Sequence, residues 1–390
     1  MTSTKSHPAY QSLLAVCAGY FLIMLLLGVD RHWSFKTSIY DTGVFDQAIW
    51  SCLNGKILLN TINFLSMPIN WLGFHFHPIL FLFVPLYKLS PSPEWLIFAQ
   101  SISITLTAFP IYKTALKLNY SDWQAFVWTI SFLLNPFVLS AAIWDFHPVA
   151  LTAPFIGLSI YYIITNKFEK LLLCIFILLL CQEHFGMLTI GIGLSYFLIN
   201  KDLKKSLAIL FIGIAYTIIL FMLVFPALSP TGAHLMMSAE VKSLNRYNWL
   251  GNSLPSVINN ILANPLLILK IALIDMEGYK YILLLLVPYG LALPILGIKI
   301  LLIGSADFAA NMLSLNPLQR SINGYHSITL IPVIIISAMV GLNLIRKTYS
   351  VKQYNRVILL TLVSFVSLFV ICIPHIFGSN SFWILSPFPA

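Results

Sequence analysis

The chain has 390 residues, of which 59% are hydrophobic and only 9% are charged, whereas soluble globular domains carry about 25% charged residues. One water-soluble core could not absorb this excess, so the composition excludes an ordinary soluble protein. The formal charge of +9 comes from basic residues that stand singly between apolar runs, which favours membrane anchoring over nucleic-acid binding.

Several apolar runs long enough for spanning helices follow one another along the chain. They lack the alternating segments of about ten residues that a membrane β-barrel needs, so they predict an all-α protein that crosses the membrane repeatedly. The first run, 11–28, is longer than a signal-peptide core and has no small-x-small cleavage site. We therefore expect an uncleaved first helix. The five cysteines show no paired spacing, which indicates neither a disulfide framework nor a cysteine metal site.

Lysine and arginine in short loops predict the orientation of the chain. The segments that we place in the cytoplasm are the N-terminus with Lys5, 113–117, 167–170, 201–205, Lys299 and 346–356. The long loop 30–93 then lies outside. Within it, the apolar stretch 78–89 would be a helix under about 20 Å long, short of a hydrocarbon core about 30 Å thick. We expect this stretch to be a half-inserted helix of the outside loop.

This orientation predicts a single integral membrane domain, 1–390, with about eleven spanning helices. The crossings expected after the first are 94–113, 123–143, 148–165, 169–182, 184–199, 206–226, 279–295, 298–312, 327–345 and 356–374. We expect an outside loop and a surface helix at 227–277 and a short outside tail at 375–390. The expected location is the plasma or inner membrane of the cell.

The unusual polar residues of the chain fall at one level in this topology, the outer ends of four apolar runs. They are Asp41, Asp46, His75, His77, Asp145, His147, Glu183 and His184. Ionisable groups at such positions are functional candidates by default, and their convergence from distant segments favours a common site. Asp41 could act as a general base or could cap the helix that begins near Gly43. Asp46 lies about 140° further around that helix, so the two carboxylates would not share a face.

The tripeptide Phe-His-Pro occurs twice, at 76–78 and at 146–148. Proline suits the first position of a helix, so both histidines are expected at helix N-termini, where the dipole and free N–H groups favour an anion. They could line a phosphate or carboxylate site, or they could merely cap two helices. Arg246 and Arg320 could grip a phosphate or anchor the chain to lipid headgroups.

Two further patterns are weaker. Asp145, His147, His75 and Glu183 could hold a divalent metal such as zinc or manganese, with Asp145 and His147 as the first candidates. No spacing matches a strong metal motif, and Glu183 could instead break a helix at a hairpin tip. The glycines of GMLTIGIG, at 186–193, lie in an apolar run and do not follow a strand. They predict close helix packing and not a nucleotide-binding loop.

At these residues the chain resembles an uncharacterised family of predicted multipass membrane proteins. The family pattern runs Tyr-Asp-x-Gly-x-Phe-Asp-Gln, His-x-x-Pro, Asp-Phe-His-Pro and a Lys/Gln-Glu tip. The matching segments are Tyr40–Gln47, His75–Pro78, Asp145–Pro148 and Gln182–Glu183, and a later Tyr325–His326 also fits. That family distantly resembles the GT-C class of integral membrane glycosyltransferases.

The GT-C resemblance implies an enzyme that moves a sugar from a polyprenyl-phosphate carrier to an acceptor on the outer face, with amphipathic juxtamembrane helices in the first outside loop. It also implies a catalytic aspartate just before one of those helices, a place that Asp41 occupies, with Asp46 as the second choice. The chain departs from the studied members in having Asp41-Thr42 where they carry an acidic pair. The residues expected to bind the substrate are His75, His77, Asp145, His147, Glu183, His184, Arg246, Arg320, Tyr325 and His326.

Two other classes of function compete with this hypothesis. A transporter or flippase for a lipid-linked or anionic substrate would also use ionisable groups, but it would place them near the bilayer midplane. A non-enzymatic membrane scaffold would not need ionisable groups to converge from four segments. The convergence at one surface favours the enzyme, with membrane lipid and a lipid-linked sugar as partners.

Overall fold

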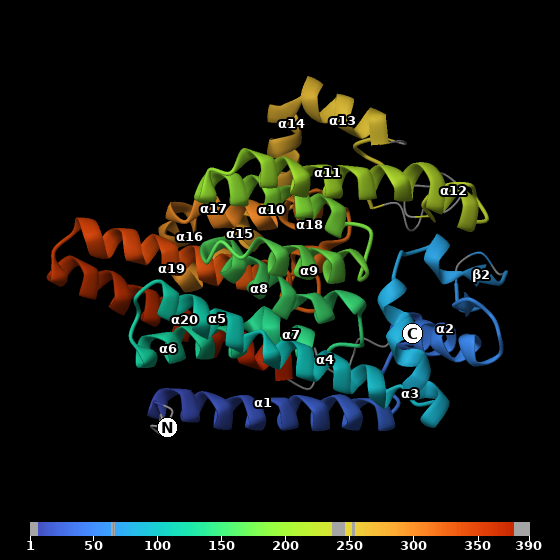
Figure 1. The fold of residues 1–390 in the computed structure, drawn as a ribbon, viewed down its shortest axis with the longest axis horizontal. Helices are drawn as coiled ribbons and strands as arrows, with labels where there is room; N and C mark the ends of the chain where they lie inside the picture. The colour runs from blue at the N-terminus through green and yellow to red at the C-terminus, as the bar shows by residue number, and fades with distance from the viewer. Residues whose placement is uncertain (1–6, 64, 66, 236–245, 252–253, 378–390) are drawn as a thin grey trace.

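The computed structural model describes residues 7–63, 65, 67–235, 246–251 and 254–377. Lys5, the centre of the outside loop at 236–245 and the tail at 378–390 lie outside these residues. Figure 1 shows an elongated bundle in which helices from distant parts of the sequence lie side by side. The first helix, α1 (Pro8–Trp33), runs along one edge of the bundle, from the N-terminus to the end that carries α2 and α3.

Most of the described residues are helical, as predicted. In the bundle the helices after α1 are α4 (Glu94–Leu106), α5 (Ala108–Lys117), α6 (Asp122–Leu133), α7 (Pro136–Ile143), η4 (Pro148–Thr152), α8 (Ala153–Ile164), α9 (Phe168–Leu179), α10 (Phe185–Asn200), α11 (Leu203–Ile219), η5 (Leu220–Val224) and α12 (Phe225–Leu228). After the loop come α13 (Leu254–Ala263), α14 (Pro265–Lys270), η7 (Ile271–Asp275), α15 (Gly278–Leu286), η8 (Val287–Tyr289), α16 (Ala292–Leu296), α17 (Ile298–Leu301), η9 (Leu302–Gly304), α18 (Ser305–Leu313), η10 (Pro317–Arg320), α19 (Leu330–Thr348) and α20 (Val351–Phe377).

Among the described residues, five helices are long and apolar enough to cross a membrane. They are Pro8–Trp33, Glu94–Lys117, Leu203–Leu228, Leu330–Thr348 and Val351–Ile373. Two helix pairs are bent at a short break. One consists of α6 and α7, and the other of α13 and the helix formed by α14 and η7. If each pair is one span, the number of spanning helices in the described part of the chain is 7. A multispanning helical membrane protein is therefore confirmed, whereas eleven crossings remain a prediction, because helices such as Phe185–Asn200 are shorter. The expected surface helix at 256–277 is the second bent pair, with an angle of 94°.

The glycine run at 186–193 packs closely against neighbouring helices, as predicted. A Cβ atom on Gly191 would lie 2.7 Å from the backbone oxygen of Leu302 and 2.9 Å from that of Ile303. A Cβ atom on Gly193 would lie 2.9 Å from the side chain of Leu210 in α11. The missing side chains thus let α10 approach both α11 and η9, the small-residue contact that membrane helices use.

Gly191→Ala is expected to destabilise the protein by about 1–3 kcal/mol, the usual cost of overpacking. The added methyl group would meet two backbone oxygens, which cannot rotate away as a side chain can. Thermal unfolding in detergent micelles would measure the effect. The matched control is Gly19→Ala in α1, where a Cβ atom meets nothing within 4 Å. Equal unfolding temperatures for the two variants would contradict the close contact at α10.

The segment between α1 and α4 builds a second, smaller hydrophobic core at one end of the bundle. Its elements are η1 (Ile39–Gly43), α2 (Val44–Leu53), β1 (Leu59–Asn60), β2 (Ile69–Asn70), η2 (Trp71–Gly73), η3 (Pro78–Phe83) and α3 (Val84–Leu89). The two strands pair antiparallel, with Leu59 opposite Asn70. Phe45, Trp71 and Leu80 pack there against Phe146 of the bundle. We call this region, on the right of Figure 1, the α2 end.

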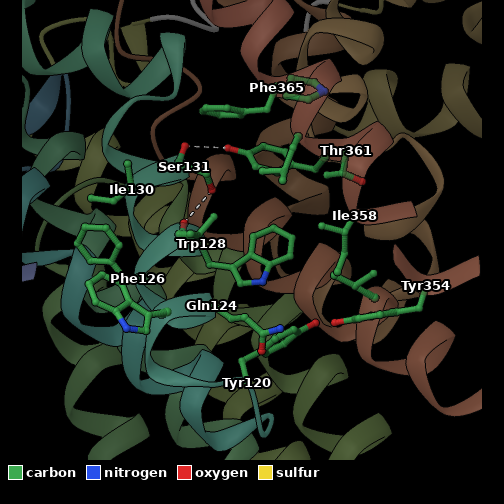
Figure 2. A pocket seen from close by; sticks show the side chains of 16 residues that line it. Tyr120, Gln124, Phe126, Trp128, Ile130, Ser131, Tyr354, Ile358, Thr361 and Phe365 are labelled. Carbon is green, nitrogen blue, oxygen red and sulfur yellow. Dashed lines mark hydrogen bonds between the residues drawn. The ribbon is translucent and has the colours of Figure 1, made fainter. Parts of the chain in front are cut away.

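A separate groove opens on the side of the bundle between α6 and α20. It has a volume of about 460 Å³, and its walls are almost entirely apolar or aromatic. Figure 2 shows Trp128 and Ser131 on one side and Ile358 and Phe365 on the other. None of the residues that line this groove lies in the segment between α1 and α4, so the groove is separate from the α2 end.

Candidate functional site

A cavity of about 210 Å³ lies at the α2 end, between the first loop and the bundle. Its walls come from segments far apart in the sequence: Tyr40, Asp41, Val44, Phe45, Trp71, Phe74, His75, His77, His147, Pro148, Gln182, Arg246 and Tyr325. The convergence expected from the sequence is therefore present for six of the candidate residues. The volume is below the roughly 300–1,000 Å³ of sites for drug-sized ligands, so it suits a phosphate group or a single sugar ring.

The two Phe-His-Pro segments place His77 and His147 at the starts of η3 and η4, as predicted. Neither imidazole caps its own helix, so the alternative role as simple caps does not apply. Both rings instead contact Phe45, each with a centroid distance of 5.6 Å. Proline fixes the start of each helix, and the side chain before it is then free to face the cavity.

Asp41 lies in η1, and its carboxylate faces His147. The N-cap of η1 is Ser38, whose hydroxyl accepts from the N–H of Tyr40 at 3.1 Å, and α2 has no side-chain cap. The alternative role of Asp41 as a helix cap therefore does not apply. Oδ1 of Asp41 lies 3.3 Å from Nε2 of His147. Burial raises the pKa of Asp41, but the hydrogen bond and charge of His147, together with the charges of Arg31 and His326, make the net shift downward. Asp41 is therefore ionised at neutral pH.

The ring of His147 is held from three sides. Its Nδ1 donates to the backbone oxygen of Asp145 over 3.0 Å, because a carbonyl oxygen only accepts. Nε2 faces the carboxylate of Asp41, which also only accepts, so the ring donates from Nδ1 to Asp145 and from Nε2 to Asp41. On one face the ring stacks on Tyr325, with a centroid distance of 3.5 Å and an angle of 21°. The orientation of the Asp41–His147 pair is thus set by its surroundings.

Asp46, the second predicted catalytic residue, does not line the cavity. Its Oδ1 accepts a hydrogen bond of 2.8 Å from the hydroxyl of Tyr87 in α3, in keeping with the angle that separates it from Asp41 on the helix. Burial raises the pKa of Asp46, and the hydrogen bond from Tyr87 opposes that shift. The structure gives Asp46 a role in holding α3 against α2.

Asp145 anchors the first loop from inside the protein. Its Oδ1 lies 2.9 Å from Nη2 of Arg31, and its Oδ2 accepts from the N–H of Ser38 at 2.6 Å. Burial raises the pKa of Asp145 to about 6, although the charge of Arg31 acts in the opposite direction. Because Ser38 precedes Asp41 by one turn, this anchor fixes the backbone that carries Asp41.

Glu183 is a buried carboxylate in the connection between α9 and α10. Its Oε1 lies 2.7 Å from Nδ1 of His75 and 3.2 Å from Nε2 of His234, and its Oε2 accepts from the N–H of Phe76 at 3.0 Å. Burial raises its pKa, but the two histidines hold the pKa well below its usual range. His234 was not predicted from the sequence, where its one signal is that it is a lone histidine in a polar loop.

His77 presents an N–H group at the wall of the cavity. The indole N–H of Trp71 donates to Nδ1 of His77 over 3.0 Å, so the neutral ring carries its own proton on Nε2. Within the described part of the chain, this Nε2 has no hydrogen-bond partner. Burial lowers the pKa of His77 well below its ordinary value, which keeps the ring neutral. A buried donor in this state calls for an acceptor from a ligand.

His75, His77 and Glu183 lie close enough to hold a metal ion, with one ligand atom of each within 4.8 Å of the others. Their hydrogen bonds argue against this use. Glu183 already receives three donors, and the lone pair of His77 is taken by Trp71. Only His75 keeps an uncommitted lone pair, on Nε2. Asp145 and His147, the first metal candidates from the sequence, are committed to Arg31 and Asp41. The arrangement favours an oxyanion or a hydroxyl over a metal.

Arg246 is the cation at the cavity wall. Its guanidinium makes no hydrogen bond or ion pair with the residues that the structure describes, while its backbone oxygen accepts from the N–H of Leu315 at 2.9 Å. The segment is therefore positioned by its main chain, and the side chain is available to a ligand. Tyr325 lines the cavity, whereas His326 stacks behind it at 4.3 Å and is not part of the wall. Burial lowers the pKa of His326 to about 3.

Two further predicted site residues, Arg320 and His184, also lie away from the cavity wall. Arg320 donates to the backbone oxygen of Asn311 over 3.1 Å and to that of Ser314, so it secures the end of α18. Nε2 of His184 lies 3.6 Å from Oδ1 of the buried Asp307. Both side chains therefore make internal contacts and do not reach the wall of the cavity.

The sequence model of a family described as "Predicted membrane protein (DUF2079)" matches residues 31–388, a range that includes the first loop and every residue of the cavity wall. No curated protein matches the chain.

Proposed function

The chain belongs to the predicted membrane protein family DUF2079, and we propose that it is a GT-C-like glycosyltransferase using a polyprenyl-phosphate sugar as its donor. The observation that carries the proposal is the cavity at the α2 end. There an ionised carboxylate, Asp41, shares one small chamber with the donors Arg246 and Nε2–H of His77. A phosphate needs such donors, and an acceptor hydroxyl needs such a carboxylate.

Arg246 and His77 bind the phosphate of the donor in this proposal. A guanidinium can make two parallel hydrogen bonds to phosphate oxygens, and the N–H of His77 adds a third from a ring that stays neutral. Aromatic side chains of Phe45, Trp71 and Tyr325 line the same cavity and offer flat apolar faces to a sugar ring. The polyprenyl tail remains in the bilayer beside the bundle.

Asp41 accepts a hydrogen bond from the acceptor hydroxyl and thereby directs the hydroxyl oxygen toward the sugar. In the reaction, the oxygen of the acceptor hydroxyl forms a bond to the anomeric carbon, and the hydroxyl proton passes to a base in the cavity. The bond between that carbon and the phosphate oxygen breaks, and polyprenyl phosphate leaves with the electron pair. His147 stabilises the charge of Asp41 from the other side. We place this site on the periplasmic or extracellular face, with the N-terminus in the cytoplasm of a cell bounded by this membrane.

The decisive test is sugar transfer by the purified full chain in lipid vesicles. Radiolabelled polyprenyl-phosphate sugars would be supplied with mixed lipid and glycan acceptors, and labelled product would be separated from the donor. We expect transfer that depends on the acceptor. A folded protein that consumes none of the donors would overturn the proposal, and movement of the same donors across the membrane would then establish transport.

Arg246→Gln is expected to weaken the binding of polyprenyl phosphate by about 10- to 100-fold, because charge-assisted hydrogen bonds contribute about 1.5–3 kcal/mol. Titration of the protein in micelles with polyprenyl phosphate, followed by calorimetry, would measure the dissociation constant. Arg356→Gln is the matched control, since Arg356 is an exposed arginine in the first turns of α20. Equal affinities for the two variants would show that Arg246 does not hold the phosphate.

A further inference from the structure

Transfer of a sugar to a hydroxyl group releases a proton, and a base in the cavity must receive it. Asp41 is poorly suited to this step, because the contact with His147 stabilises its ionised form. A carboxylate that is stabilised in this way orients a hydroxyl well but takes its proton weakly. A second group with a free lone pair is therefore needed at the cavity wall.

His75 has such a lone pair. Its Nδ1 lies 2.7 Å from Oε1 of Glu183, and because an ionised carboxylate only accepts hydrogen bonds, the proton of the neutral ring is on Nδ1. Nε2 then carries the lone pair. The side chain of His75 lines the cavity and is 19% exposed, whereas that of Glu183 is 9% exposed. The imidazole thus lies between a buried carboxylate and the chamber that would hold the acceptor.

We propose that His75 is the general base of the transfer reaction and that Glu183 is the residue that positions it. The inference rests on the proposed glycosyltransferase function. The proton of the acceptor hydroxyl passes to Nε2 of His75 as the oxygen bonds to the anomeric carbon and the phosphate departs. His75 becomes an imidazolium paired with Glu183, and it later returns the proton to water or to the departing phosphate.

The surroundings of Glu183 favour this role. The carboxylate receives hydrogen bonds from His75, His234 and the N–H of Phe76, so it cannot turn away when the imidazolium forms. A fixed carboxylate on Nδ1 sets the tautomer and stabilises the positive ring, the arrangement known from carboxylate–histidine–nucleophile triads. Burial lowers the pKa of His75 and Glu183 opposes that shift, which leaves the ring neutral and ready to accept a proton at neutral pH.

His75 and His77 have opposite tautomers although their rings lie side by side. The centroids are 5.4 Å apart and the planes differ by 23°. The carboxylate of Glu183 places the proton of His75 on Nδ1, while the indole of Trp71 places that of His77 on Nε2. The two rings therefore contribute an acceptor and a donor, respectively. In the proposed reaction, His75 therefore accepts a hydrogen bond from the acceptor hydroxyl, and His77 donates one to a phosphate oxygen.

The test compares His75→Gln with His7→Gln, a histidine at the opposite end of α1, in the vesicle assay with radiolabelled polyprenyl-phosphate sugars. We expect His75→Gln to lower kcat about 10²–10⁴-fold and to leave the affinity for polyprenyl phosphate unchanged. The control variant His7→Gln should remain active. Added imidazole should restore part of the activity of His75→Ala, which a purely structural role would not allow.

Glu183→Gln tests the positioning role through the pH profile. The charged or titratable groups that face His75 are Glu183, His234, His77 and Arg246. Of these, Glu183 is the anion that raises the pKa of His75, so its neutral replacement should lower that pKa further. The acid limb of kcat/KM should therefore move to lower pH, with a smaller maximal rate. Glu169→Gln, at the start of α9, is the matched control.

The outcomes separate the two proposals. Wild-type transfer together with undiminished transfer by His75→Gln would overturn the role of His75 and leave the glycosyltransferase function standing. Absence of transfer by folded wild-type protein would overturn both. Should His75→Gln not fold, Glu183→Gln decides the matter, and an acid limb that does not move would overturn the inference.

Discussion

Asp41→Asn is expected to lower sugar transfer by about 10²-fold or more, the scale of the loss when a reacting group is misplaced, because Asp41 orients the acceptor hydroxyl. The amide keeps the size of the side chain but loses the charge that faces His147 at 3.3 Å and the full acceptor capacity offered to the hydroxyl. Because the side chain of Asp41 is 32% exposed, the fold should survive the change. Initial rates in vesicles with labelled donor would measure the loss.

Asp30→Asn is the matched control for this variant, since Asp30 is an exposed aspartate in the last turn of α1. Asp46→Asn separates the two candidate carboxylates of the first loop. It should retain transfer, because Asp46 is bound to Tyr87 away from the cavity. If Asp46→Asn were inactive and Asp41→Asn fully active, the catalytic role would belong to Asp46.

Arg31→Met is expected to destabilise the folded protein by about 3–5 kcal/mol, the cost of breaking a buried ion pair. The side chains of Arg31 and Asp145 are 5% and 1% exposed, so the variant leaves a carboxylate buried without its cation. Thermal unfolding in detergent at pH 5 and pH 7.5 would measure the loss. The Arg31→Met/Asp145→Asn double variant should recover part of the stability, because it removes the uncompensated charge.

The deficit of Arg31→Met should be smaller at the lower pH. The folded pKa of Asp145 is already raised to about 6 by burial, above an unfolded value near 3.9, and loss of Arg31 raises it further. The folded state therefore binds a proton that the unfolded state releases, so lowering the pH through the folded pKa stabilises the folded state. Unfolding temperatures equal to wild type at both pH values would show that the pair does not hold the loop.

The helical, multispanning architecture follows from the sequence alone. In lipid, the backbone hydrogen bonds of a spanning segment are satisfied only in an α-helix or in a closed β-barrel. The apolar runs of α1 and α20 do not alternate as barrel strands do, so they form helices whatever the neighbouring segments are. The same holds for the helix starts at Pro78 and Pro148, which depend on the geometry of proline, and for the contact at Gly191, which depends on the absence of a side chain. The family membership was also predicted from local motifs.

Tertiary packing decided which polar residues act together. Asp41 and Asp46 lie on one short segment, yet one faces His147 and the other Tyr87. Asp145 and His147 are only two residues apart, yet one side chain pairs with Arg31 and the other with Asp41. Local sequence predicted that all four lie at one level of the membrane, but it did not encode these directions separately.

The tautomers of His75 and His77 illustrate the reason. Their partners are Glu183, which is 108 residues away, and Trp71, which is 6 residues away. Residue types and spacing fix hydrophobic burial and helix boundaries, because these depend on near neighbours. A hydrogen bond between distant side chains forms only where packing brings a donor within about 3 Å of an acceptor. The chemistry of the cavity therefore depends on the tertiary structure, whereas the helical membrane bundle that supports it can be predicted from the sequence.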